Sequence, residues 1–147
     1  MSDWARTRRL SCRVVLSSDE PLTGDLHLQP LGSPEHPVET PLEMLNRPER
    51  FFALAVDDDV RLISKDAVRA VAVERDQMES HPLARRVEVQ LRTDDGADYR
   101  GTVEIELAPP SNRLLDFLNQ PEPFLALLAD DQSWCLNRHR LLWVRPL

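Results

Sequence analysis

The chain repeats part of its own sequence, and this repeat constrains the fold more than any other feature. Residues 40–73 align with residues 113–146 without a gap, at a spacing of 73 residues. Eleven of the 34 aligned pairs are identical, among them Asn46 with Asn119. Several of the remaining pairs keep their apolar character, such as Met44 with Phe117 and Ile63 with Leu136. We interpret the repeat as an internal duplication, which predicts two similar structural units.

Each unit has the sequence pattern of a small β-rich fold. Short alternating runs predict two strands at its start, and the apolar runs 51–56 and 124–129 predict strands covered on both faces. We expect a mainly β (α+β) chain of two tandem β-β-α-β-β-β units, each a small antiparallel barrel or bent sheet. The predicted divisions are an N-terminal tail (1–7), the first unit (8–75), a linker (76–84) and the second unit (85–147).

A short helix is predicted before each apolar run. Thr40 and Glu43 have the spacing of a capping box, with proline at the first helical position. Asn46 is suited to end this helix in the left-handed conformation. For the second helix, Ser111 or Asn112 is the expected N-cap.

Composition excludes several classes of function. The 147 residues carry a net charge of −7, and the basic residues form no stripe, so nucleic acid is not an expected partner. Two cysteines, Cys12 and Cys135, are too few for a disulfide framework or a four-ligand metal site. The sequence has no signal-peptide pattern and no apolar run of about 18 residues, which predicts a cytoplasmic protein without membrane insertion.

No catalytic motif is present, so we predict neither an enzyme nor a bound cofactor or metal. The chain lacks a phosphate-binding glycine loop and a nucleophile elbow, and its four histidines are scattered. The aspartate pair at 57–58, repeated at 130–131, could in principle serve acid–base chemistry or bind a cation. We interpret both pairs as hairpin turns, because aspartate is favoured there.

The second unit resembles a small bacterial β-rich domain. The resemblance rests on a Gly-x-Val-x-Ile strand, an Arg-Leu-x-Asp-x-Leu-Asn helix, a Phe-led strand and a late Leu-Asn-Arg corner. These motifs lie at 101–105, 113–119, 124–125 and 136–138, and the first unit carries a degenerate copy. The resemblance implies a fold and a bacterial origin, and it implies no activity.

The start of the second unit is also similar in shape to Sm-like barrels. The similarity rests on the pattern from Val89 to Leu91, the turn at Asp95-Gly96 and the strand from Tyr99 to Val103. The Asp and Asn pair and the Ile-Arg-Gly motif that carry RNA binding in that family are absent. The likeness therefore implies a shape alone.

Positions at which the two units differ in polarity indicate different surroundings. The second unit has gained large apolar side chains, which are typical anchors of protein interfaces. Trp134, Leu142 and Trp143 stand where the first unit has Arg61, Arg69 and Ala70. These three residues form either a contact surface for a partner or the packing between the two units. Trp4, in the polar tail, is a further candidate contact.

The sequence thus predicts a non-catalytic interaction or assembly protein, an adaptor or scaffold, that contacts protein partners or itself. It would use the apolar surface of the second unit or an exposed strand edge. The alternative is a regulatory protein that senses a small ligand at the seam between the units. Buried polar groups at the seam would favour the sensor, and a dry seam with exposed tryptophans would favour the adaptor.

Overall fold

The computed structural model describes residues 7–147, so Trp4 lies outside the described residues. Two segments of the chain contain the same succession of elements. The N-terminal half contains β1 (Arg8–Leu16), β2 (Leu22–Leu28), α1 (Pro41–Asn46), β3 (Phe51–Val56), β4 (Asp59–Ser64), η2 (Lys65–Ala67) and β5 (Val68–Glu74). After η3 (Arg75–Gln77), the C-terminal half contains β6 (Arg85–Thr93), β7 (Asp98–Ile105), α2 (Leu114–Leu118), β8 (Phe124–Leu128), β9 (Gln132–Asn137), η4 (Arg138–Arg140) and β10 (Leu141–Pro146).

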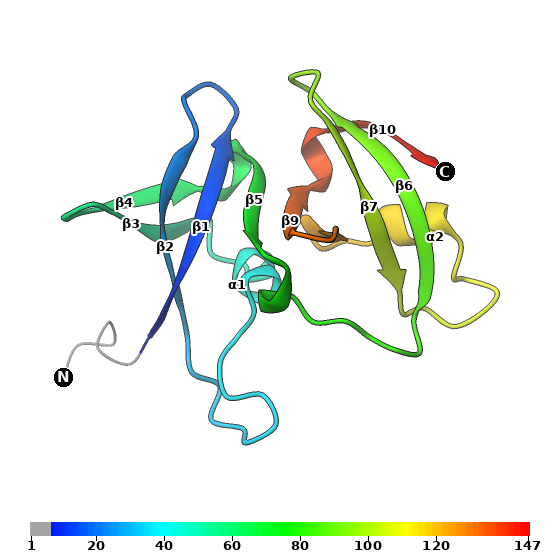
Figure 1. Cartoon of the computed structure of the whole chain (residues 1–147), viewed down its shortest axis with the longest axis horizontal. Coiled ribbons are helices and arrows are strands. Elements are labelled where there is room, and N and C mark those ends of the chain that lie inside the picture. The colour runs from blue at the N-terminus through cyan, green and yellow to red at the C-terminus, as the bar shows by residue number, and fades with distance from the viewer. Residues whose placement is uncertain (1–6) are drawn as a thin grey trace.

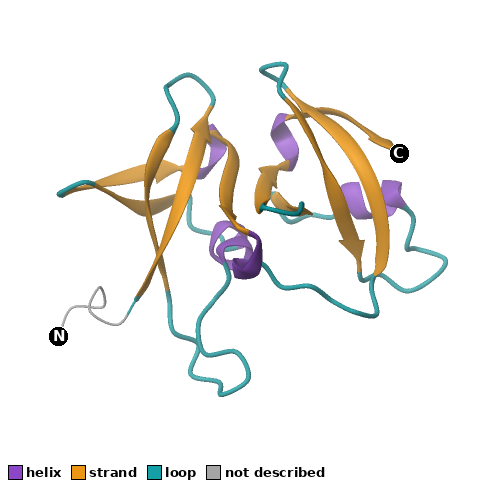
Figure 2. Ribbon diagram, viewed as in Figure 1, coloured by secondary structure: helices purple, strands orange, loops and turns teal. Residues whose placement is uncertain are grey.

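The strands form one antiparallel sheet, which confirms that the chain is mainly β. The strand order is β10-β6-β7-β8-β9-β5-β1-β2-β3-β4, so each half contributes five neighbouring strands in the same internal order. The halves meet where β5 pairs with β9, with Ala70 opposite Leu136 and Glu74 opposite Gln132. Figures 1 and 2 show these two strands in the middle of the molecule, between two lobes.

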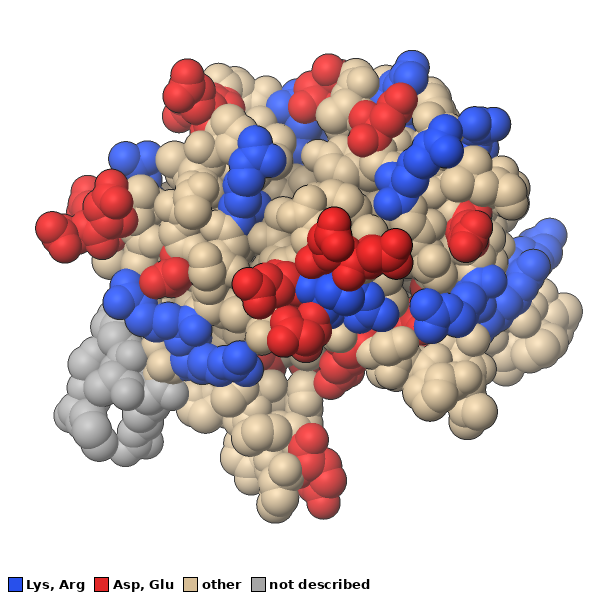
Figure 3. Space-filling view, in the orientation of Figure 1, with Lys and Arg blue, Asp and Glu red and all other residues tan. Residues whose placement is uncertain are grey.

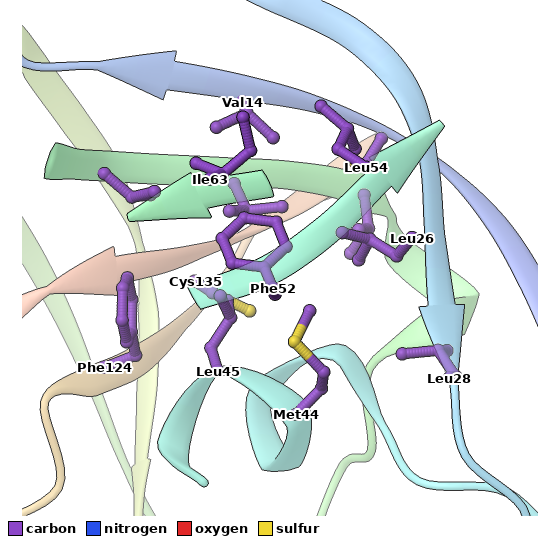
Figure 4. Packing of buried hydrophobic residues seen from close by; sticks show 14 of the residues in the cluster. Val14, Leu26, Leu28, Met44, Leu45, Phe52, Leu54, Ile63, Phe124 and Cys135 are labelled. Carbon is purple, nitrogen blue, oxygen red and sulfur yellow. The ribbon is translucent and has the colours of Figure 1, made fainter. Parts of the chain in front are cut away.

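The sheet encloses two hydrophobic cores, and the central strands contribute to both. Successive side chains of a strand point to opposite faces. Val71 of β5 and Cys135 of β9 therefore belong to the first core, whereas Ala70 and Leu136 belong to the second. Phe124 of β8 also enters the first core, as Figure 4 shows. The N-terminal half thus packs directly against one face of the β8–β9 hairpin.

The capping box of α1 is confirmed. The Glu43 backbone N–H donates to Thr40 Oγ1 over 3.1 Å, and the Thr40 N–H donates to Glu43 Oε1 over 3.0 Å. The predicted left-handed end at Asn46 is wrong, because Asn46 is still helical and the chain leaves in an extended conformation at Arg47. The Asn46 side chain instead contacts the other half.

The predicted start of α2 at Ser111 or Asn112 is also wrong. Arg113 is the N-cap residue, and its backbone N–H and guanidinium both donate to the Asp116 carboxylate, over 3.0 to 3.1 Å. An ion pair to the third helical residue replaces the expected hydroxyl or amide cap. Among the described residues, no helix is long and apolar enough to cross a membrane.

The predicted hairpin turns are confirmed. Asp57 and Asp58 connect β3 to β4, and Asp57 has a positive φ of 54°, a conformation that aspartate tolerates better than most residues. Gly96, with φ of 85°, closes the β6–β7 hairpin. In Figure 3 the turn between β3 and β4 is the acidic cluster at the far left of the molecule. Asp57 and Asp58 are exposed there, in a turn.

Candidate functional site

Trp134 lies in the middle of the sheet. It is partly buried on β9, opposite Ala72 of β5, and it packs against the second core. Its ring meets Tyr99 edge-on, with 5.3 Å between the ring centroids and an angle of 75°. Trp134 therefore contributes to the packing where the two halves meet.

Leu142 and Trp143 lie together on the edge strand β10, where they are 60% and 37% exposed. The guanidinium of Arg92 sits 4.9 Å from the centroid of a Trp143 ring. Leu91, next to Arg92, is buried opposite Tyr99. Because neighbouring residues of a strand point to opposite faces, Trp143 lies on the outer face of this sheet, away from the Trp134–Tyr99 pair. The structure thus brings two of the three predicted contact residues together and places Trp134 elsewhere.

Asn46 joins α1 to β8 across the two halves, a role that the sequence analysis missed. Its Nδ2 donates to the Phe124 carbonyl over 3.1 Å, and its Oδ1 accepts from the Phe124 N–H over 2.8 Å. Asn119, the aligned residue of α2, donates to the Leu115 carbonyl of its own helix over 3.0 Å. The same residue type thus links the halves in one position and only its own helix in the other.

A cation holds the end of each short helix, buried at Lys65 and partly buried at Arg138. Lys65 Nζ donates to the carbonyls of Met44 and Arg47 over 3.0 and 2.9 Å. The aligned Arg138 donates to the carbonyls of Phe117 and Phe124 over 2.9 and 3.1 Å. Burial lowers the pKa of both side chains. These cations add donors at the helix ends, where the last carbonyls lack intrahelical partners, and Arg138 also reaches the first residue of β8, Phe124.

A cavity of about 410 Å³ lies at the seam between the halves. It is lined by α1, the connector after β5, the end of β7, α2 and β8. Its apolar lining includes Leu42, Met78, Leu107, Phe117 and Phe124. Its charged lining comprises Glu43, Glu79, Glu104, Glu106 and Glu122, with His81 and Arg138. The seam therefore combines an apolar interior with an excess of carboxylates.

Two histidines connect the carboxylates around this cavity. His36 Nε2 lies 2.5 Å from Glu43, and its Nδ1 lies 3.3 Å from Glu79. His81 Nδ1 lies 2.9 Å from Glu106. The hydrogen bond with Glu43 raises the pKa of His36, although partial desolvation opposes the change. Partial burial acts to raise the pKa of Glu43, but hydrogen bonds from Thr40 and His36 lower it overall.

An apolar patch, which we call the β3–β4 face, lies on the outer side of that hairpin. It comprises Phe51, Val60 and Leu62, which are 56%, 52% and 69% exposed. Leu62 lies opposite Ala53, and Val60 lies opposite Ala55. The prediction that residues 51–56 are covered on both faces is therefore wrong at Phe51. The aligned residues Phe124, Ser133 and Cys135 are at most 1% exposed.

The described sheet ends at two edges that differ in chemistry. Leu147 donates its N–H to Glu88 of β6 over 2.9 Å, so the neighbouring Pro146 nitrogen is directed away from β6. Proline has no N–H to offer an incoming strand. The register of β10 also shifts between Leu141 and Trp143. In contrast, β4 has six residues in regular register with β3 and contains no proline.

The two cysteines are free and buried, and burial raises the pKa of each to about 12. Residues 7–147 contain no group of three or more histidine, cysteine, aspartate or glutamate side chains placed to hold a metal ion.

A comparison with protein-family models, curated proteins and solved structures found no match to this chain. The function is therefore argued from the geometry alone.

Proposed function

We propose that this chain is a non-catalytic interaction or assembly protein, an adaptor or scaffold that recruits protein through an open edge of its sheet. The observation that carries the proposal is the β4 edge. This strand ends the described sheet, has a regular extended backbone and presents Val60 and Leu62 beside the exposed Phe51. An unprotected edge offers unpaired backbone groups, and the adjacent apolar patch offers side-chain contacts.

We further propose that the two halves arose by duplication, as the repeat suggests. The shared element order, the aligned helix-end cations Lys65 and Arg138, and the carboxylate at the third helical position of both helices support this origin. The bacterial origin and cytoplasmic location implied by the sequence stand as part of the same proposal. The likeness to the small bacterial β-rich domain, and the likeness in shape to Sm-like barrels, are also part of this proposal.

Recognition at β4 would follow β-strand addition. An extended segment gains main-chain hydrogen bonds from the edge, and its alternate side chains gain contacts with the neighbouring apolar face. The matching edge at β10 is blocked by Pro146, so it cannot pair as fully. We propose Leu142 and Trp143 as a second contact, made through side chains rather than through the backbone.

A displayed library of unstructured peptides, selected on the wild-type protein, tests the proposal. We expect enrichment of extended segments with alternating apolar residues, and loss of their binding in Leu62→Pro, which removes an edge-facing N–H. The matched control is Leu62→Val, which keeps this N–H and an apolar side chain and should retain the binding. Circular dichroism and melting curves verify that both variants are folded. Absence of enrichment over an unrelated sheet protein would refute the proposal.

The seam cavity supports a second candidate, the ligand-sensing protein. Its apolar lining and its carboxylates favour an organic cation with an apolar body. Phenethylamine and phenylacetate have similar apolar parts and opposite charges, so they form a matched pair of probes. If the seam cavity binds such a cation, phenethylamine should raise the melting temperature of the protein and phenylacetate should not. Glu122→Gln should reduce the increase that phenethylamine causes. Equal responses to both compounds would exclude it.

A further inference from the structure

We infer that the β4 edge binds a second copy of this chain, and that the two β4 strands pair antiparallel across a twofold axis. The inference rests on the proposed function and names its partner. Val60 and Leu62 of each copy would pack against those of the other copy across the new strand pair, and Phe51 would extend the shared apolar face. The product is a closed dimer in which the two ten-stranded sheets continue into each other.

The buried state of the corresponding face in the other half shows what such a hairpin requires. Phe124 is 1% exposed, whereas its identical counterpart Phe51 is 56% exposed. Phe124 and Cys135 are covered because β9 pairs with β5 and the hairpin packs on the first core. β4 is the counterpart of β9 in the strand order, and in the described chain no strand pairs with its outer side. The same strand edge is therefore paired within the molecule at β9 and left open at β4.

Head-to-tail association of copies cannot cover the β4 edge. It would repeat the β5–β9 junction between molecules and pair β4 of one copy with β10 of the next. The junction buries Ala70 and Ala72, at 0% and 8% exposure, and the aligned residues of β10 are Trp143 and Arg145. Large side chains at positions that fit alanine would overpack the contact. Pro146 also removes one of the edge-facing donors.

The geometry of β4 favours pairing with itself. The two-residue turn at 57–58 makes Val56 and Asp59 the closing pair of the hairpin, so alternate residues Val60, Leu62 and Ser64 direct their backbone groups outward. Antiparallel pairing with Leu62 opposite Leu62 of the second copy uses these groups, and the Val60 N–H exchanges its 2.9 Å bond to Asp59 Oδ1 for one to the second copy. It also places Arg61 opposite Ile63 of the second copy, which separates the two arginines.

The dimer closes because each copy supplies one unblocked edge, and a twofold contact consumes it on both sides. Six-residue strands and three apolar side chains per copy form a small interface, well below the roughly 1,600 Å² of a standard stable complex. We therefore expect a reversible dimer that dissociates on dilution. Detection requires protein concentrations from about 10 to about 500 μM, the range in which small interfaces associate.

Sedimentation velocity over this concentration range is the first test. We expect the wild type to shift from the monomer mass of 16.9 kDa toward twice that mass. Leu62→Arg should remain monomeric throughout, because it places like charges against each other at the twofold axis. Leu115→Arg, the same substitution at a residue of α2 that is 60% exposed, should associate as the wild type does. Melting curves confirm that both variants fold.

Cross-linking tests the register independently. Paired residues of antiparallel strands have Cα atoms about 4.5 to 5.5 Å apart, within the range of a disulfide. Leu62→Cys should therefore form a disulfide-linked dimer under mild oxidation, because residue 62 faces itself. Val60→Cys should not, because residue 60 faces Ser64 of the second copy. The native cysteines are buried and do not compete.

A wild type that stays monomeric at the highest concentration overturns the inference, as does a Leu62→Arg variant that still dimerises. Growth beyond the dimer would indicate head-to-tail assembly and also overturns it. If the protein is monomeric but selected peptides bind at β4, the inference fails while the proposed function stands. If the protein neither dimerises nor selects peptides, both fail.

Discussion

Replacing Asn46 with alanine tests whether one amide side chain holds the two halves together. Asn46 donates to the Phe124 carbonyl and accepts from the Phe124 N–H, over 3.1 and 2.8 Å. In the variant, the carbonyl keeps the Arg138 guanidinium as a donor at 3.1 Å. The Phe124 N–H, in contrast, loses its acceptor, and no other acceptor bonds to it in the described structure. The main loss is therefore one orphaned donor in a buried residue.

The expected cost follows from these bonds. Each lost hydrogen bond costs about 0.5–1.5 kcal/mol, and a buried N–H without a partner costs about 1–3 kcal/mol. We expect Asn46→Ala to lower the free energy of unfolding by about 2–4 kcal/mol. For a chain of this length, that loss lowers the melting temperature by about 5–15 °C.

Asn119→Ala is the matched control, since it removes the same side chain from the aligned position. Asn119 is exposed and bonds only to its own helix in the described structure, so we expect a loss below about 1 kcal/mol. Urea unfolding of the three proteins, monitored by circular dichroism, measures the difference. Equal losses in the two variants would refute the argument that Asn46 acts across the halves.

Three further predictions follow from the buried and ionisable groups. Lys65→Met removes the ammonium that donates to the Met44 and Arg47 carbonyls at the end of α1. Because the Met44 carbonyl keeps the Arg47 N–H as a donor, the loss should be about 1–3 kcal/mol in urea unfolding, and Lys65→Arg should cost less. The raised pKa of His36 stabilises the fold below its ordinary value of 6.5, and this contribution is lost as the pH rises through the higher folded value. Wild-type stability relative to His36→Gln should therefore fall above pH 6.5, and an unchanged difference would contradict the assignment. Both thiols, with pKa values near 12, should resist a thiol-specific dye at pH 8 in the folded protein and react fully after denaturation.

Local features of the fold could be predicted where the physics is local. The Thr40 capping box and the turn at Asp57-Asp58 depend on residues a few positions apart, and both predictions were correct. The role of Asn46 was not predictable from the sequence. Asparagine suits both a left-handed helix end and a side-chain hydrogen bond to a distant strand, so the residue type does not distinguish the two. Its true partner lies 78 residues away, and only the packing of the halves decides between the two roles.

The candidate surface depended on packing in the same way. Comparing aligned positions identified where the units differ, and it drew attention to the tryptophans of the second unit. That comparison could not identify Phe51, because Phe51 and Phe124 are identical in sequence and differ only in what covers them. The seam cavity was equally hidden, since its carboxylates come from four separate segments. Polarity differences report on surroundings, whereas identical residues in different surroundings carry no sequence signal.

The contrast between the two edges explains why a chain of two similar halves need not polymerise. The halves are joined through the fifth strand of one, β5, and the fourth strand of the other, β9, which leaves a fourth and a fifth strand free. If both free edges had kept the junction chemistry, every molecule would bind the next without limit. Trp143, Arg145 and Pro146 remove that chemistry from the fifth strand of the second unit. The fourth strand of the N-terminal half, β4, contains no proline and stays in regular register, so the proposed strand pairing is expected at the edge beside Phe51.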